Sequence, residues 1–129
     1  MGLYDKVSGG FDRTADIPGK SKTRYITSAD ATAGVVELET GDTSVIAEIP
    51  LAAADSYVIK LPPISDTVGQ RYSLYGRRAT GSYVDGEVTV DDHGDGGLSA
   101  TDGMTATGDH LCLEPFMGLL WKTVYDVTT

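Results

Sequence analysis

Short apolar runs separated by turn residues fill the sequence from Ser56 to Tyr125, and they limit the chain to a fold built from strands. The runs S-Y-V-I-K-L, Q-R-Y-S-L-Y, E-V-T-V and H-L-C-L lie between clusters of proline, glycine and aspartate. None of them is long enough, or periodic enough at 3.6 residues, to predict a helix. This spacing is typical of an all-β domain.

Alternation of apolar and polar residues also marks strands in the N-terminal half. Gly34–Glu39 and Thr43–Ile49 each place apolar side chains on one face, and Thr40–Asp42 between them has the composition of a turn. These two segments predict a hairpin. The Asp85-Gly86 dipeptide is a strong two-residue turn motif, so it predicts a second hairpin between residues 82–84 and 87–90.

The last two strands are predicted at His110–Glu114 and Leu119–Val127, joined around Pro115–Gly118. Altogether the chain suggests roughly ten short strands at close spacing, which favours an antiparallel β-sandwich or a small, jelly-roll-like β-barrel. A parallel α/β sheet is disfavoured, because no strand–helix–strand rhythm is present.

The first 23 residues differ from the rest in having few apolar residues and two breaks, Gly9-Gly10 and Pro18-Gly19. We therefore expect an extended arm over residues 1–23 and a β-domain over residues 24–129. The arm is expected to dock on a neighbouring subunit, with a packed extension of the same chain as the alternative. Its candidate contacts are Leu3, Tyr4, Val7, Phe11 and Ile17.

The 129 residues suffice for one domain and carry a net charge of −9. A domain this acidic repels phosphate backbones, so nucleic acid is not expected as a partner. The charge suits a basic protein surface, or it serves only solubility. No apolar stretch is long enough for a membrane span, and residues 1–20 contain no apolar signal-peptide region, so we expect no membrane partner and synthesis in the cytoplasm.

A weak metal motif lies in the acidic stretch that begins at Asp91. Asp91, Asp95 and Asp102 fall at positions 1, 5 and 12 of a calcium-type loop, with Gly96 at position 6. His93 at position 3 is a poor calcium ligand, and aspartate replaces the longer glutamate at position 12. An ordinary Asp- and Gly-rich turn explains the same residues, so no metal site is assigned.

Other chemistry is not indicated. Cys112 lies two residues from His110, so in a strand their side chains share a face; a buried small hydrophobe is the simpler interpretation of this cysteine. The sequence has no G-x-S-x-G, P-loop or zinc-ligand pattern, so we expect no catalytic residues, no cofactor and no enzymatic activity. Trp121 is interpreted as a core residue, with an exposed aromatic anchor as the alternative.

Four segments between Tyr57 and Val124 together resemble a pattern in small β-domains of tailed bacteriophages, found in tail-fibre modules and capsid decoration (cement) proteins. The matching residues are Leu61, Pro62, Gly69, Tyr72, Leu74, Val88, Val90, Gly108, Asp109, Leu111, Leu113, Gly118, Trp121 and Val124. In the usual pattern a longer, polar turn precedes the tryptophan. Here Glu114–Leu120 is apolar instead.

The resemblance implies a virion structural protein. The short chain with its arm favours a decoration protein, which would bind the major capsid protein on the outer capsid surface as a homotrimer and stabilise the shell. The basic pair Arg77 and Arg78 joins the arm as a candidate partner contact. The alternative is a tail-fibre, carbohydrate-binding or calcium-binding β-module.

Overall fold

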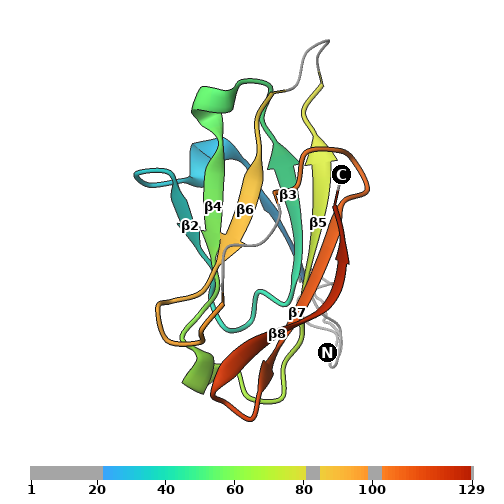
Figure 1. Cartoon of the computed structure of the whole chain (residues 1–129). Coiled ribbons are helices and arrows are strands. Elements are labelled where there is room, and N and C mark those ends of the chain that lie inside the picture. The colour runs from blue at the N-terminus through green and yellow to red at the C-terminus, as the bar shows by residue number, and fades with distance from the viewer. Residues whose placement is uncertain (1–21, 81–84, 99–102, 129) are drawn as a thin grey trace, which may run out of the picture.

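Eight strands and three single turns of 3-10 helix make up the described part of the chain. The computed structural model describes residues 22–80, 85–98 and 103–128 (Figure 1). The strands are β1 (Thr23–Ile26), β2 (Val35–Glu37), β3 (Ser44–Ile49), β4 (Tyr57–Lys60), β5 (Tyr72–Arg78), β6 (Val88–Asp91), β7 (His110–Phe116) and β8 (Leu120–Val127). The helical turns are η1 (Ser28–Asp30), η2 (Ala53–Asp55) and η3 (Ile64–Asp66). The predicted all-β class is confirmed.

The strands form two sheets between which the chain alternates (Figure 1). The larger sheet has the order β1-β3-β5-β7-β8 and the smaller has the order β2-β4-β6. Strands β1, β3 and β5 run parallel to one another, as do β2, β4 and β6. The chain therefore winds as a coil of three turns, and the antiparallel strands β7 and β8 then extend the larger sheet beyond β5.

The antiparallel pairing expected from the sequence is wrong for β1 to β6. The segments Gly34–Glu39 and Thr43–Ile49 contain β2 and β3, which lie in different sheets and form no hairpin. Alternating polarity fixes which face of a strand is buried, but it does not select the neighbouring strand. Residues 82–84 of the second predicted hairpin lie outside the described residues, and β6 pairs in parallel with β4. The last predicted hairpin, β7 with β8, is confirmed.

Inward side chains of the two sheets form one hydrophobic core. Its central rows are Val45, Leu74 and Leu111 in the larger sheet and Val36, Ile59 and Val90 in the smaller sheet, all of them buried. Trp121 is also buried and meets the ring of Tyr72 edge-on, with 5.7 Å between the ring centroids. The interpretation of Trp121 as a core residue is confirmed.

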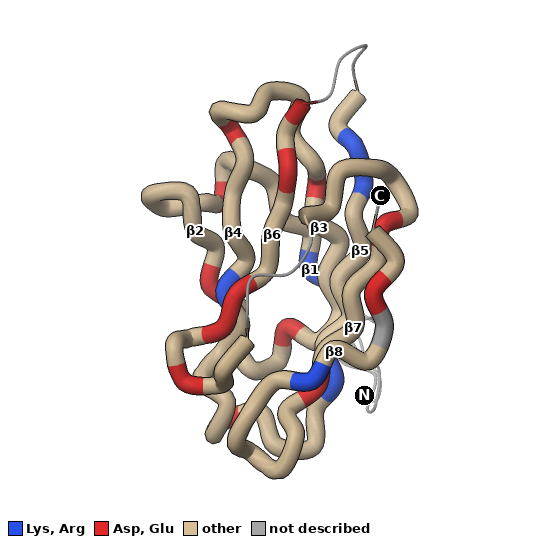
Figure 2. Tube along the Cα trace, in the orientation of Figure 1, with Lys and Arg blue, Asp and Glu red and all other residues tan. Residues whose placement is uncertain are grey.

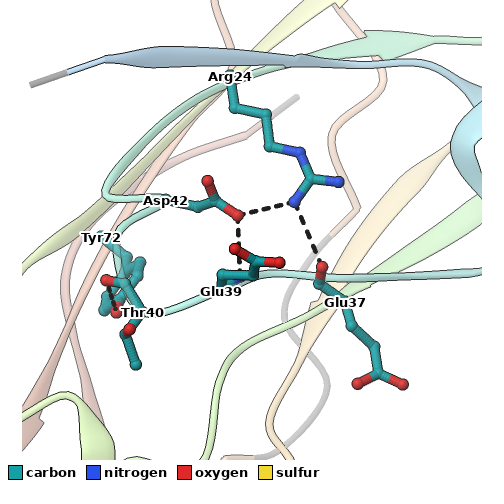
Figure 3. Close-up of polar contacts among 6 residues, drawn as sticks. All are labelled: Arg24, Glu37, Glu39, Thr40, Asp42 and Tyr72. Atoms are coloured by element: carbon teal, nitrogen blue, oxygen red, sulfur yellow. Dashed lines mark hydrogen bonds and ion pairs between the residues drawn. The ribbon is translucent and has the colours of Figure 1, made fainter. Parts of the chain in front are cut away.

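The turn that carries the chain from β2 to β3 is fixed by polar contacts (Figure 3). Asp42 Oδ2 lies 2.7 Å from Arg24 Nη1 on β1 and accepts a 2.8 Å hydrogen bond from the backbone N–H of Glu39. The hydroxyl of Tyr72 on β5 donates to the carbonyl oxygen of Thr40 at 2.7 Å. Two strands of the larger sheet thereby hold the turn that enters it from the smaller sheet.

Tyr57 ties the two sheets together through a buried polar contact. Tyr57 is the first residue of β4 in the smaller sheet, and its hydroxyl donates to the carbonyl oxygen of Glu48 on β3 at 2.8 Å. Burial, with the nearby carboxylates of Glu48 and Asp30, raises the pKa of this phenol well above its ordinary value. Burial and the charge of Asp42 likewise raise the pKa of Tyr72 to about 12. Both rings are therefore held as neutral hydrogen-bond donors.

We expect stability to fall at alkaline pH because of these two phenols. A pKa that is raised by folding contributes stability that is complete below the unfolded value, about 10, and is lost as the pH rises through the folded value. Urea unfolding between pH 8 and 11.5 should show this loss. Tyr57→Phe should unfold about 1 kcal/mol more easily at pH 8 and lose less stability as the pH rises. Tyr25→Phe, at an exposed ring, should behave as the unmodified chain, and an equally steep loss in Tyr57→Phe would contradict the account.

A single buried carboxylate organises the loop that follows β6. Asp92 accepts hydrogen bonds from the backbone N–H groups of Gly94, Gly96 and Leu98, at 2.7, 3.3 and 2.8 Å. Burial alone would raise the pKa of this carboxyl group, but the three hydrogen bonds and the charge of His93 outweigh it, so the pKa is lowered. The Asp- and Gly-rich stretch is therefore an ordered turn, in which three backbone N–H groups donate to the Asp92 carboxylate.

Candidate functional site

The turn between β7 and β8 is built at a conformational cost. Met117 and Gly118 have φ values of 56° and 68°, and the N–H of Leu119 donates to the carbonyl oxygen of Phe116 at 3.0 Å. Two successive positive φ values suit a tight hairpin, in which glycine or asparagine is preferred at both positions. Methionine in this region costs on the order of 1 kcal/mol. The residue is therefore not the best choice for folding, which points to another role.

The turn between β7 and β8 lies at one end of the molecule (Figure 1). Exposed apolar residues occur at and beside it. We call the set the apolar tip: Val68, Phe116, Met117, Leu119 and Leu120, all exposed. Met117 and Leu119 are 78% and 72% exposed. Val68 comes from the segment after η3, and its Cγ2 atom would lie 3.7 Å from a Cβ added at Gly118, so the two segments are in contact range. No charged residue occurs between Glu114 and Lys122.

A second apolar feature crosses the outer face of the larger sheet. The pairing register places one residue from each strand in a single row, here called the outer row: Tyr25, Ile46, Tyr75, His110 and Val127. Tyr25, Tyr75 and Val127 are exposed. Tyr75 stacks on His110 with 4.4 Å between ring centroids and 18° between planes, so its ring is held in place. No described element covers this face in Figure 1.

Polar groups beside the outer row join β5 to β7. Ser73 Oγ lies 2.7 Å from His110 Nε2, and burial lowers the pKa of His110, which favours the neutral ring. The register places Cys112 opposite Ser73, so His110 and Cys112 share the outer face, as expected for alternate residues of a strand. Burial raises the pKa of the Cys112 thiol, and the thiol form is unreactive as a nucleophile. The cluster of Ser73, His110 and Cys112 therefore has a structural role, in which Ser73 is a hydrogen-bond partner of the His110 ring.

The predicted calcium ligands are occupied with backbone contacts where they are described. Asp91 Oδ1 accepts from the N–H of Asp92 at 2.8 Å, and Asp95 Oδ2 accepts from the N–H of Ile64 at 3.0 Å. Asp102 lies outside the described residues. Among the residues that the structure describes, no group of three His, Cys, Asp or Glu side chains is placed to hold a metal ion. The sequence assigned no metal site here, and the weak calcium candidate stays untested.

The predicted partner contacts are only partly described. Arg77 and Arg78 lie at the end of β5 with exposed side chains, far from the apolar tip along the sheet (Figure 2). The five apolar residues predicted for the arm all lie outside the described residues, so the arm also remains a prediction. Sequence reasoning did not assign the apolar tip. Its signal was the apolar stretch Glu114–Leu120, at a place where a polar turn is usual.

Comparisons with known proteins give no further assignment. No protein-family model matches the chain, and no similar protein was found among curated proteins or solved structures. Within residues 22–80, 85–98 and 103–128, no helix has the length and apolar character needed to cross a membrane.

Proposed function

We propose that this chain is a virion structural protein of the capsid decoration type, which binds the outer lattice of the major capsid protein and stabilises the shell. One observation carries the proposal: five apolar side chains are exposed at the apolar tip, four of them at the β7–β8 turn, where Met117 is held at an unfavourable positive φ. Contiguous exposed apolar groups are typical of protein-binding surfaces. Leu119 and Met117 are the side chains best placed to enter a pocket on a partner.

The charge of the molecule supports a protein partner with a basic rim. Acidic residues are spread over both sheets and the loops, whereas the turn at the apolar tip is uncharged (Figure 2). A molecule with a net charge of −9 would be attracted to a basic surface and guided toward it. Binding that requires the assembled lattice adds stability to the shell by mass action. The proposed location is therefore the outer capsid surface.

For the finer fold we propose a sandwich rather than a barrel. Support comes from the shared core of the two sheets and from the edge strands that each sheet has among the described strands. A jelly roll is not retained, because its strands are antiparallel and β1 to β6 pair in parallel.

Substitution in the apolar tip should weaken binding to the shell without unfolding the protein. The assay is cosedimentation with undecorated shells assembled from the major capsid protein of the same genome. Leu119→Asp should lower the affinity at least tenfold, because a charge would have to be desolvated in an apolar contact. Val124→Asp is the matched control at an exposed apolar residue outside both the tip and the outer row, and it should bind as the unmodified chain does.

Met117→Gly separates folding from binding at the same turn. Glycine relieves the positive φ, so the free energy of unfolding should stay the same or rise by about 0.5 kcal/mol. Shell affinity should nevertheless fall, because the exposed side chain is lost. Equal binding by Leu119→Asp, Met117→Gly and Val124→Asp would remove the apolar tip from the proposal.

A carbohydrate-binding module is the second candidate, and one observation favours it. Tyr75 is an exposed ring held rigid by His110, with the hydroxyl groups of Ser44 and Ser73 nearby on the same face. Such a ring and its neighbouring hydroxyls suit a sugar ring. Neutral monosaccharides at millimolar concentration should then shift the NMR signals of Tyr75 in a saturable way. That result, with no binding to shells, would favour this candidate over the first.

A further inference from the structure

A groove of about 350 Å³ lies on the outer face of the larger sheet. Ile46 and Tyr75 of the outer row line it, together with Ser44, Ser73 and Arg77. Stacking on His110 fixes the ring of Tyr75, so this wall is already formed before anything binds. The groove is large enough for one or two side chains of a bound segment and is not covered by any described residue.

Thr23 of β1 also lines the groove, at the point where the described part of the chain begins. The 21 residues before Lys22 contain six larger apolar side chains: Met1, Leu3, Tyr4, Val7, Phe11 and Ile17. They also contain three acidic and three basic residues, so their net charge is zero. The whole net charge of −9 therefore resides in residues 22–129.

This division of charge bears on how two copies can meet. Two bodies that each carry −9 repel one another, which opposes direct contact between them. The N-terminal segment has a net charge of zero, so it can bring apolar groups to an acidic body without that net repulsion. Fully extended, 21 residues reach about 70 Å, several times the radius of gyration of about 13 Å expected for a body of this size. The segment is therefore long enough to reach a neighbour.

We propose that the groove receives the N-terminal segment, residues 1–21, of a second copy of the chain. The inference rests on the proposed function, because it supplies the contact between adjacent copies on a lattice. β1 begins at Thr23 and runs parallel to β3 and β5, so a chain that enters β1 would have to reverse its direction just before Thr23 to reach its own groove. A neighbour's segment needs no such reversal. If each copy's segment enters the groove of the next copy in turn, three copies close a ring, as in a trimer.

Photocrosslinking in isotopically mixed samples tests the occupant. Full-length chain carrying benzoylphenylalanine at Phe11 is prepared in ¹⁴N and ¹⁵N forms, mixed and irradiated. The expected products join residue 11 to peptides that contain Ile46 or Tyr75, with both isotopes in one product. A probe placed at Leu119 is the control and should give no such product. Products of a single isotope only, or none in the groove, would overturn the proposal.

Complementation provides the second measurement. A chain lacking residues 1–21 and the full chain with Ile46→Arg should each associate at least tenfold more weakly than the unmodified chain in analytical ultracentrifugation. Ile46 is half-buried on the outer face, so Tyr75→Lys serves as a second groove variant if Ile46→Arg does not fold. Mixing the truncated chain with a groove variant should restore a pair with one working contact. No restoration by either groove variant would contradict the assignment.

The crosslinking and shell-binding results together distinguish a failure of the groove assignment from a failure of the proposed capsid role. Mixed-isotope products without any binding to shells would leave the groove assignment standing and reject the capsid role. Shell binding through the apolar tip without mixed-isotope products would support the capsid role and reject the groove assignment. A sugar that occupies the groove while Phe11 gives no crosslink would overturn the groove assignment.

Discussion

Gly96→Ala is expected to lower the free energy of unfolding by about 3 kcal/mol, near the upper end for overpacking a core. A Cβ atom at this position would overlap Cδ1 of the Trp121 ring and would lie 2.8 Å from its Nε1 atom. The ring has little room to move, because it is buried against Tyr72. The backbone has little room either, since Gly96 accepts a 2.9 Å hydrogen bond from the N–H of Trp121. Denaturant unfolding measures the loss.

Gly41→Ala is the matched control for this substitution. Nothing lies within 4 Å of a Cβ at Gly41, so the free energy of unfolding of this variant should differ from that of the unmodified chain by less than about 0.5 kcal/mol. If both alanine variants unfolded at the same denaturant concentration, the close packing of Trp121 on the Asp92 loop would be refuted.

Asp92→Ala should also cost about 3 kcal/mol, because it removes the acceptor of three backbone N–H groups at once. Gly94, Gly96 and Leu98 donate to this carboxylate, and the N–H of Gly96 is buried. Each buried donor left without a partner costs on the order of 1–3 kcal/mol, and donors that reach water cost less. Urea unfolding at neutral pH measures the total.

The same carboxylate gives a pH dependence with a definite sign. Folding lowers the pKa of Asp92, so its contribution is complete above the ordinary value of about 4 and is lost as the pH falls through the folded value. The difference in stability between the unmodified chain and Asp92→Ala should therefore shrink as the pH falls below about 4. Asp66→Ala, in η3, is the control at another acidic residue, and its difference should stay small throughout. A constant gap between pH 7 and pH 2 for Asp92→Ala would contradict the role assigned to its charge.

The sequence predicts the class of fold better than its topology. Alternation in segments such as Thr43–Ile49 correctly indicates a strand with one buried face, because that pattern depends only on the strand itself. The parallel coil leaves no comparable signal. Thr23 pairs with Ser44, and Ser44 pairs with Ser73, which are offsets of 21 and 29 residues, so the turns of the coil do not repeat at a fixed length. Only long-range packing selects these neighbours.

The hairpin of β7 and β8 was predictable because its turn is local. What the sequence did not reveal is that the turn stands clear of the core, with Met117 at a positive φ and Val68 beside it. Val68 is separated from the hairpin by about fifty residues, so no local pattern joins them. The groove is hidden for the same reason, since Thr23, Ile46 and Tyr75 meet only through strand register.

Cryo-electron microscopy of undecorated shells mixed with the purified chain tests the central claim most directly. The account predicts added density on the outer surface of the lattice, shaped as two packed sheets, with Met117 and Leu119 against the capsid subunits. Shells that show no added density while the chain stays in solution, or density that holds the apolar tip away from the lattice, would contradict it.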